Sequence, residues 1–142
     1  MRVSCIISGV VGAVVVLAVL MLFFGVNFRH TDSSSLTYSQ ANEVLVSGVV
    51  QETQQFACPV SEGEMGDHVI LKTDQGLVLV HLAPGRVLRG HNIAFKPGQK
   101  MQVLGSRGRY NGMTSLIARE VTTDTDVFQL RDASGKLLMK QY

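Results

Sequence analysis

Residues 3–26 form an apolar run of 24 positions without a single charged side chain. A helix rises about 1.5 Å per residue, so this run would extend for about 36 Å. The hydrocarbon core of a bilayer is about 30 Å thick. We therefore expect residues 1–28 to form a transmembrane anchor, which leaves the remainder of the chain for one small domain.

A cleaved signal peptide is the alternative interpretation of this segment. Signal peptides have an apolar core of about 7 to 15 residues and a cleavage site of small residues. The run here is longer and ends in "FFGVNFRH", where large side chains stand. The N-terminal flank carries the α-amino group and Arg2, whereas Asp32 offsets Arg29 on the other side. The length of the run and its large final residues favour an uncleaved anchor in the plasma membrane. The charge bias favours a cytoplasmic N-terminus and a periplasmic or otherwise extracytoplasmic C-terminal domain.

The chain beyond the anchor is predicted to be a tether followed by a β domain. Residues 29–41 are polar and rich in serine, as in flexible linkers. Residues 42–142 alternate valine-rich runs with glycine turns and leave room for only one or two helical turns. The expected elements are a strand over 43–56 bent at Gly48, a hairpin over 68–83, a short helical connection over 84–99, a hairpin over 100–121 turning at Asn111-Gly112, and a last hairpin over 126–139.

This order of elements is that of an OB-fold, a five-stranded Greek-key barrel with a helical connection after the third strand. The stretches "VLVSGVV", "VHLAP", "GQKMQVLGS" and "MTSLIAREV" resemble small bacterial membrane-anchored OB-fold domain proteins. The layout is also similar to the haem chaperone of cytochrome c maturation. That family binds haem covalently through a histidine after the last barrel strand, and "REVTTDTDVFQLRD" has none. The resemblance therefore implies the architecture and the compartment, but not haem attachment.

Cys58 has no plausible disulfide partner, because the only other cysteine, Cys5, lies in the predicted anchor. In an oxidising compartment a leftover thiol can form an intermolecular bridge, bind a metal or stay inert and buried. His68 and His81 stand on the two arms of the first hairpin and are the candidate partners of Cys58 in a metal site.

The loop of this hairpin decides whether the two histidines meet. A two-residue loop at Asp74-Gln75 pairs His68 with His81 on one face, with Cβ atoms about 5 Å apart. A three-residue loop ending at Gly76 shifts the register by one and places the rings on opposite faces. The Asp-Gln-Gly sequence favours the three-residue loop. The alternative to a metal site is a half-buried cysteine beside two hydrogen-bonded histidines at strand ends.

Charge is segregated along the chain. Six acidic residues and one lysine occupy 43–74, whereas 75–119 holds seven basic residues and no acidic one. Outside the cytoplasm nucleic acid is scarce, so anionic lipid or an acidic protein surface is the more plausible partner for this basic stretch. The candidate ligand-binding or partner-binding residues are Arg86, Arg89, Lys96, Lys100, Arg107, Arg109 and Tyr110.

No catalytic arrangement is recognisable in the sequence. There is no phosphate-binding glycine loop, and the acidic loop with Glu62, Glu64 and Asp67 lacks both an acid/base partner and the ligand spacing of a calcium loop. We therefore expect a binding protein rather than an enzyme. The first hypothesis is an accessory or interaction subunit of a membrane or envelope protein assembly. The alternatives are a metal or haem carrier and an oligonucleotide-binding domain.

Overall fold

The computed structural model describes residues 36–60 and 63–139, all of them within one compact unit, Ser33–Tyr142. The predicted anchor and the first part of the predicted tether lie outside the described residues. Among the described residues no helix has the length and apolar character needed to cross a membrane.

The described chain is mostly β-structure, as the sequence predicts. Helix is confined to two short segments, one before the first strand and one after the third. The elements in order are η1 (Gln40–Asn42), β1 (Glu43–Ala57), β2 (Met65–Thr73), β3 (Gly76–Pro84), α2 (Gly85–Gly90), β4 (Lys100–Tyr110), β5 (Met113–Thr123) and β6 (Val127–Gln129).

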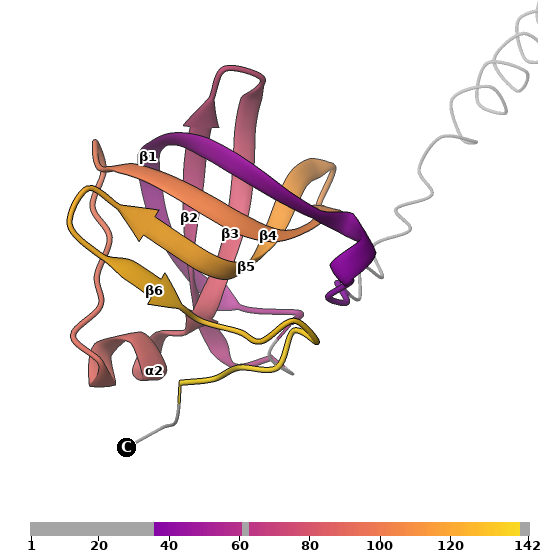
Figure 1. Cartoon of the computed structure of the whole chain (residues 1–142), viewed down its shortest axis with the longest axis vertical. Helices are drawn as coiled ribbons and strands as arrows, with labels where there is room; N and C mark the ends of the chain where they lie inside the picture. Colours follow the sequence, from indigo (N-terminus) through magenta and orange to yellow (C-terminus); the bar gives the residue numbers. More distant parts are fainter. Residues whose placement is uncertain (1–35, 61–62, 140–142) are drawn as a thin grey trace, which may run out of the picture. The chain divides into compact units, whose positions relative to one another are not determined.

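The six strands form one sheet in the order β3-β2-β1-β4-β5-β6. An additional pairing between β3 and β5 joins the sheet to itself, so that β1 to β5 make a closed ring (Figure 1). This joining pair is parallel, and all other neighbours are antiparallel. In Figure 1 the short helix α2 lies at one end of the ring, after β3.

Strand β1 pairs with two neighbours and changes partner next to Gly48. It pairs with β4 over Glu43–Val49 and with β2 from Val49 to Ala57. A Cβ atom at Gly48 would lie 2.5 Å from the carbonyl oxygen of Lys72. Only glycine allows β1 and β2 to approach this closely. The register shift of β1 lies just beyond this point, between Val50 and Glu52.

Both faces of β2 and β3 are buried, which sets them apart from ordinary half-exposed strands. Val69, Leu71, Val80 and Leu82 pack into the main apolar core. Because side chains alternate along a strand, the intervening residues point to the opposite face of the sheet. There His68 and His81 are buried as well, beside Ile70 and Leu79.

The turn between β2 and β3 closes on two residues, Asp74 and Gln75, and Thr73 pairs with Gly76. The preference for a three-residue loop was therefore wrong. The Thr73 hydroxyl accepts a hydrogen bond from the Gln75 N–H and donates one to the Gly76 carbonyl, and these bonds hold the tighter turn. The turn between β4 and β5 lies at Asn111-Gly112, as predicted, and both residues have positive φ.

The C-terminal segment differs from the expected hairpin. Its first arm, β6, pairs with β5. Within the described residues the returning chain pairs with 130–132 through the bridge between Arg131 and Leu137 and through the hydrogen bonds Asp132 N–H to Lys136 and Leu138 N–H to Leu130. The Asp132 side chain accepts hydrogen bonds from Ser134 and from the Lys136 N–H, so the reversal itself is well formed. The expected two-stranded hairpin is thus replaced by an edge strand and a tight turn.

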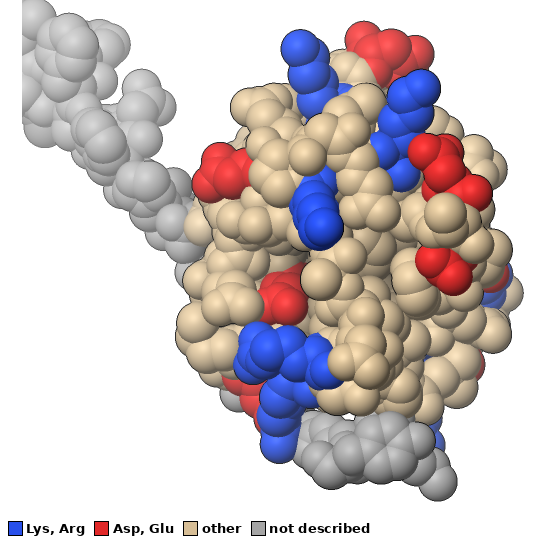
Figure 2. Space-filling model, turned by 90° about the vertical axis from the view of Figure 1, so that its left-hand side faces the viewer, with Lys and Arg blue, Asp and Glu red and all other residues tan. Residues whose placement is uncertain are grey.

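The ring brings the two oppositely charged stretches of the sequence together. Glu43 forms an ion pair with Arg119, and Glu64 forms one with Arg86. Figure 2 shows the result on one face, where Lys and Arg side chains alternate with Asp and Glu. Charge that is segregated in the sequence is intermixed on this face of the folded domain.

Candidate metal centre

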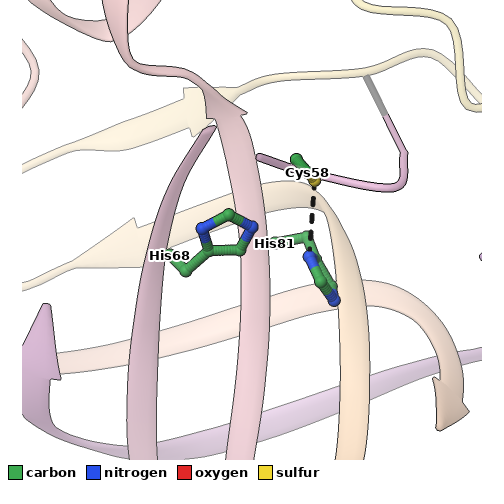
Figure 3. Close-up of side chains that lie close together, drawn as sticks. All are labelled: Cys58, His68 and His81. Carbon is green, nitrogen blue, oxygen red and sulfur yellow. Dashed lines mark hydrogen bonds between the residues drawn. The ribbon is translucent and has the colours of Figure 1, made fainter. Parts of the chain in front are cut away.

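Cys58, His68 and His81 come together at one end of the β2–β3 pair (Figure 3). His68 and His81 are direct partners in the antiparallel register, so their side chains share a face. Cys58 follows the last residue of β1 and approaches the histidines from the loop that leads to β2. The ligand atoms of the three side chains all lie within 4.8 Å of one another.

The loop holds Cys58 by its backbone. The Cys58 N–H donates to the carbonyl of Glu64, and the Cys58 carbonyl accepts from the N–H of Gly63. Gly66 makes room beside the thiol, because a Cβ atom there would lie 2.9 Å from the Cβ of Cys58 and 3.1 Å from Cε1 of His68. The cluster therefore depends on a glycine whose role is to leave space.

Within the cluster the contacts are close and the exposure is minimal. The Sγ atom of Cys58 lies 3.5 Å from Nδ1 of His81. The two imidazole rings meet edge to face, with centroids 4.8 Å apart. Cys58 retains 3% of its exposure, His68 1% and His81 none. Cys58 is thus buried rather than half-buried, whereas a hydrogen bond does join it to His81, as the alternative to a metal site expects.

The ring nitrogens are the least expected feature of the site. Both nitrogens of His68 and Nε2 of His81 are buried and have no hydrogen-bond partner within residues 36–60 and 63–139. The backbone at Gly66 and Gln54 lies near the His68 ring but outside hydrogen-bond geometry. Buried polar atoms are nearly always paired, so each exception requires an explanation. A metal ion, which takes one nitrogen from each ring, would supply one for a nitrogen of His68.

Two aromatic rings cover the histidines. The Phe56 ring stacks on the His68 ring, with centroids 3.6 Å apart and planes at 8°. The Tyr110 ring meets the His81 ring at 87°, with centroids 5.3 Å apart. Phe56 and Tyr110 are themselves stacked at 5.9 Å. Tyr110, predicted as a partner-binding residue, thus belongs to this cover.

Burial keeps both imidazoles uncharged. It lowers the pKa of His68 to about 4, although the nearby backbone of Gly66 and Gln54 acts in the opposite direction. Burial also lowers the pKa of His81 to about 3, with further contributions from His68 and Arg131. Both rings are neutral near pH 7, which is the protonation state that binds metals.

Arg131 lies beside the cluster and is a residue that no sequence signal marks. Its Nη1 atom donates to the carbonyl of Leu82, at 2.5 Å, and to that of Ala118, at 2.6 Å. Burial lowers the pKa of Arg131 to about 10, while Cys58 and Tyr38 act to raise it. A buried cation therefore lies next to the cluster.

The other predicted binding residues are distributed over several places. Lys100, Arg107 and Arg109 line an open groove of about 1390 Å³ together with Lys72. Arg86 is paired with Glu64, while Arg86, Arg89 and Lys96 do not line the groove. The groove also contains Leu45, Val49 and Leu77, which are exposed apolar side chains. The predicted basic set thus separates into groove residues and residues elsewhere.

The chain matches the model of a known protein family. The model of the MamS/MamX magnetosome protein family matches residues 42–128, which include β1 to β5 and all three residues of the cluster. No curated protein matches the chain.

Proposed function

Because this chain belongs to the MamS/MamX magnetosome protein family, a small bacterial family, we propose that it is a membrane-anchored metal-binding module that acts at the magnetosome. Cys58, His68 and His81 are the proposed ligands. The module acts by binding rather than by catalysis. It presents three donors to a metal ion.

One observation carries this proposal: three metal-ligating side chains converge in a buried place where ring nitrogens have no other partner. Leaving a buried polar atom unpaired costs about 1 to 3 kcal/mol. Three such atoms in one site are hard to explain in a domain whose total stability is about 5 to 15 kcal/mol. A bound metal ion takes one nitrogen from each ring, so it would pair a nitrogen of His68 and offset part of this cost.

The position of the site agrees with the ligand-binding face of an OB-fold. We assign the ring to this fold because its strand order and the helix after β3 are those of the five-stranded Greek-key barrel. OB-folds bind ligands on the face of strands two and three, between the loops after strands one and four. His68 and His81 lie on β2 and β3, Cys58 lies in the loop after β1, and Tyr110 ends β4.

The site suits a bare metal ion better than haem. The donors face one another rather than an open space, and the Phe56 and Tyr110 rings pack directly on the histidines. A flat macrocycle would have to displace both rings. Together with the missing haem-attachment histidine, this packing favours an ion over the haem-carrier alternative.

The predicted anchor over residues 1–28 would hold the module on the outer side of the membrane that the chain enters. The predicted tether over residues 29–41 would keep the module attached to this membrane. A metal ion bound there is presented next to membrane proteins, which gives the module its proposed role as an accessory subunit of a membrane assembly.

Metal content tests the proposal. The full chain is purified in mild detergent, stripped with a chelator, and loaded separately with Cu(I), Zn(II) and Fe(II). After gel filtration we expect close to one equivalent of at least one of these metals in wild type. Cys58→Ser and His81→Gln should retain less than a tenth of that amount. Cys5→Ser and His91→Gln are the matched controls and should load like wild type. Metal content equal in wild type and Cys58→Ser would contradict the proposal.

The groove supports a second candidate function, the docking of an acidic segment from a partner membrane protein. Four basic side chains, Lys72, Lys100, Arg107 and Arg109, border exposed Leu45, Val49 and Leu77. An acidic peptide with apolar residues complements both properties, since charge steers the encounter and apolar contacts hold the complex. In this candidate function the groove residues would form the partner-binding surface of the interaction subunit that the sequence analysis expects.

Charge reversal in the groove tests this second candidate. Extraction of the membrane in mild detergent should bring partner proteins out with wild type, and Arg107→Glu/Arg109→Glu should lose them. Arg86→Glu, outside the groove, should keep them. The same preparations are titrated with single-stranded oligonucleotide at two salt concentrations. Salt-sensitive oligonucleotide binding that the groove variant loses would instead favour nucleic acid as the occupant.

A further inference from the structure

The donor set of the Cys58/His68/His81 cluster is small. Within the described residues the cluster comprises one thiol and two imidazoles, and no carboxylate belongs to it. Structural zinc sites use four protein ligands, and catalytic ones add water to three. A thiolate with two imidazoles is a soft, three-donor set, which is typical of copper.

The geometry is close to that of a three-coordinate centre. With metal–sulfur and metal–nitrogen bonds of about 2.3 and 2.1 Å, donors around a trigonal ion lie about 3.8 Å apart. The Cys58 Sγ and His81 Nδ1 atoms are already 3.5 Å apart. The widest separation in the cluster, 4.8 Å, must close by about 1 Å. A small rotation of a side chain achieves this.

Charge distinguishes a monovalent from a divalent ion in this place. A metal-bound Cys58 thiolate contributes one negative charge, and neutral imidazoles contribute none. A monovalent ion thus gives a neutral centre, and a divalent ion leaves one net positive charge. The donors are at most 3% exposed, and net charge is costly to bury.

Arg131 increases this difference. Its guanidinium donates to the carbonyl of Leu82, which follows His81 in β3, and to that of Ala118, which follows Ile117, the β5 partner of His81. At 3% exposure this cation is as buried as the cluster itself. It repels a centre with net positive charge and leaves a neutral centre almost unaffected.

Resting on the proposed metal-binding function, we propose that the Cys58/His68/His81 site selects monovalent copper, Cu(I), over divalent ions, and that Arg131 is the positioning residue that sets this preference through its charge. Both parts of the site contribute to this preference. The thiolate favours a soft ion, and the charge of Arg131 disfavours a centre with net positive charge.

Competition experiments on the full chain in detergent test this inference. Cu(I) is held under reducing, oxygen-free conditions against a colorimetric Cu(I) chelator, and Zn(II) is titrated against a zinc chelator. We expect one Cu(I) per chain and a dissociation constant at least 100-fold lower than that of Zn(II). Equal affinity for the two ions, or tighter binding of Zn(II), would overturn the inference while leaving the metal-binding function intact. Binding of neither ion would overturn the inference as well, and if Fe(II) also failed to bind, the proposed function itself would be removed.

Variants of Arg131 separate its charge from its packing. Arg131→Gln should strengthen Zn(II) binding at least tenfold and change Cu(I) binding less than threefold. Arg131→Lys, which keeps the charge, should restore the wild-type ratio. If Arg131 has a purely structural role, Arg131→Gln should weaken the binding of Cu(I) and Zn(II) to the same extent. That result would overturn the proposed effect of the Arg131 charge on metal preference. The wild-type comparison decides the preference for Cu(I) even if Arg131→Gln fails to fold.

Discussion

The Sγ atom of Cys58 lies 3.5 Å from Nδ1 of His81, although 23 positions separate the two residues in the chain. Strand β2 lies between them in the sequence and contributes His68, so the three donors arise from one strand–loop–hairpin unit. The fold thus assembles the candidate metal site from neighbouring elements of the sheet.

Metal should stabilise the folded protein through this site. A ligand that binds only the folded state, at 100 times its dissociation constant, adds about 2.7 kcal/mol. For a domain of this size this corresponds to a rise of roughly 10 °C or more in the unfolding temperature. Thermal unfolding of the stripped and loaded full chain measures the shift. Cys58→Ser should abolish the shift and Cys5→Ser should preserve it; the same shift in both would argue against Cys58 as a ligand.

Without metal, the protein should lose stability as the pH falls from 7 to 5. Unfolded histidine titrates near pH 6.5, whereas the pKa values of His68 and His81 in the folded state are about 4 and about 3. Below pH 6.5 the unfolded chain therefore binds protons that the folded chain does not. The free energy of unfolding should fall by up to about 4 kcal/mol for the pair.

Denaturant unfolding at several pH values, with a chelator present, measures this slope. The range from pH 7 to pH 5 lies above the ordinary titration of carboxylates. The double variant His68→Gln/His81→Gln should have a flatter dependence than wild type. Parallel curves for the two proteins would show that the histidines are not buried in the neutral form.

Removing the aromatic cover should expose the site to water. The Phe56 ring stacks on His68 at 3.6 Å, so Phe56→Ala should raise the pKa of His68 toward its ordinary value and speed metal transfer to a chelator about tenfold or more. An NMR titration of the His68 ring and stopped-flow transfer measure these two effects. Tyr110→Phe keeps a ring beside His81 and should behave like wild type. An unchanged His68 titration in Phe56→Ala would contradict this role of the cover.

Filling the space at Gly66 should damage the site directly. The new methyl group of Gly66→Ala would lie 2.9 Å from the Cβ of Cys58, so the loop or His68 must move. Overpacking of this kind typically costs about 1 to 3 kcal/mol, and we expect metal affinity to fall at least tenfold. Gly90→Ala is the control, because nothing lies within 4 Å of its added Cβ. Calorimetric titration with metal compares the two; equal affinities would show that Gly66 does not shape the site.

The strands of the domain could be predicted because their signals are local. Asn111-Gly112 closes a hairpin by its own conformational preference, and Gly48 lies where β1 and β2 approach too closely for a side chain to fit. The C-terminal hairpin was predicted less well, because β6 pairs with β5 and the two arms are joined only close to the turn, within 130–138. The choice between two competing pairing partners is a long-range property that local sequence does not contain.

The sequence predicted which residues could form the candidate site, but not that they lie together. Cys58, His68 and His81 could be named, but their meeting depended on one residue of hairpin register. Asp-Gln-Gly fits two loop lengths, and the hydrogen bonds of Thr73 that settle the choice are seen only in the folded turn. The stacking of Phe56 on His68 and the burial of Arg131 depend on contacts between residues far apart in the chain. No local sequence pattern predicts them.

The most direct test of the metal centre is an X-ray absorption spectrum at the edge of the bound metal in the loaded full chain. The structure predicts a first shell with one sulfur at about 2.3 Å and two nitrogens at about 2.0 to 2.1 Å whose outer-shell scattering is that of imidazole. Cys58→Ser should lose the sulfur contribution. A wild-type spectrum with only oxygen neighbours, or with no sulfur and no imidazole, would contradict a site built from Cys58, His68 and His81.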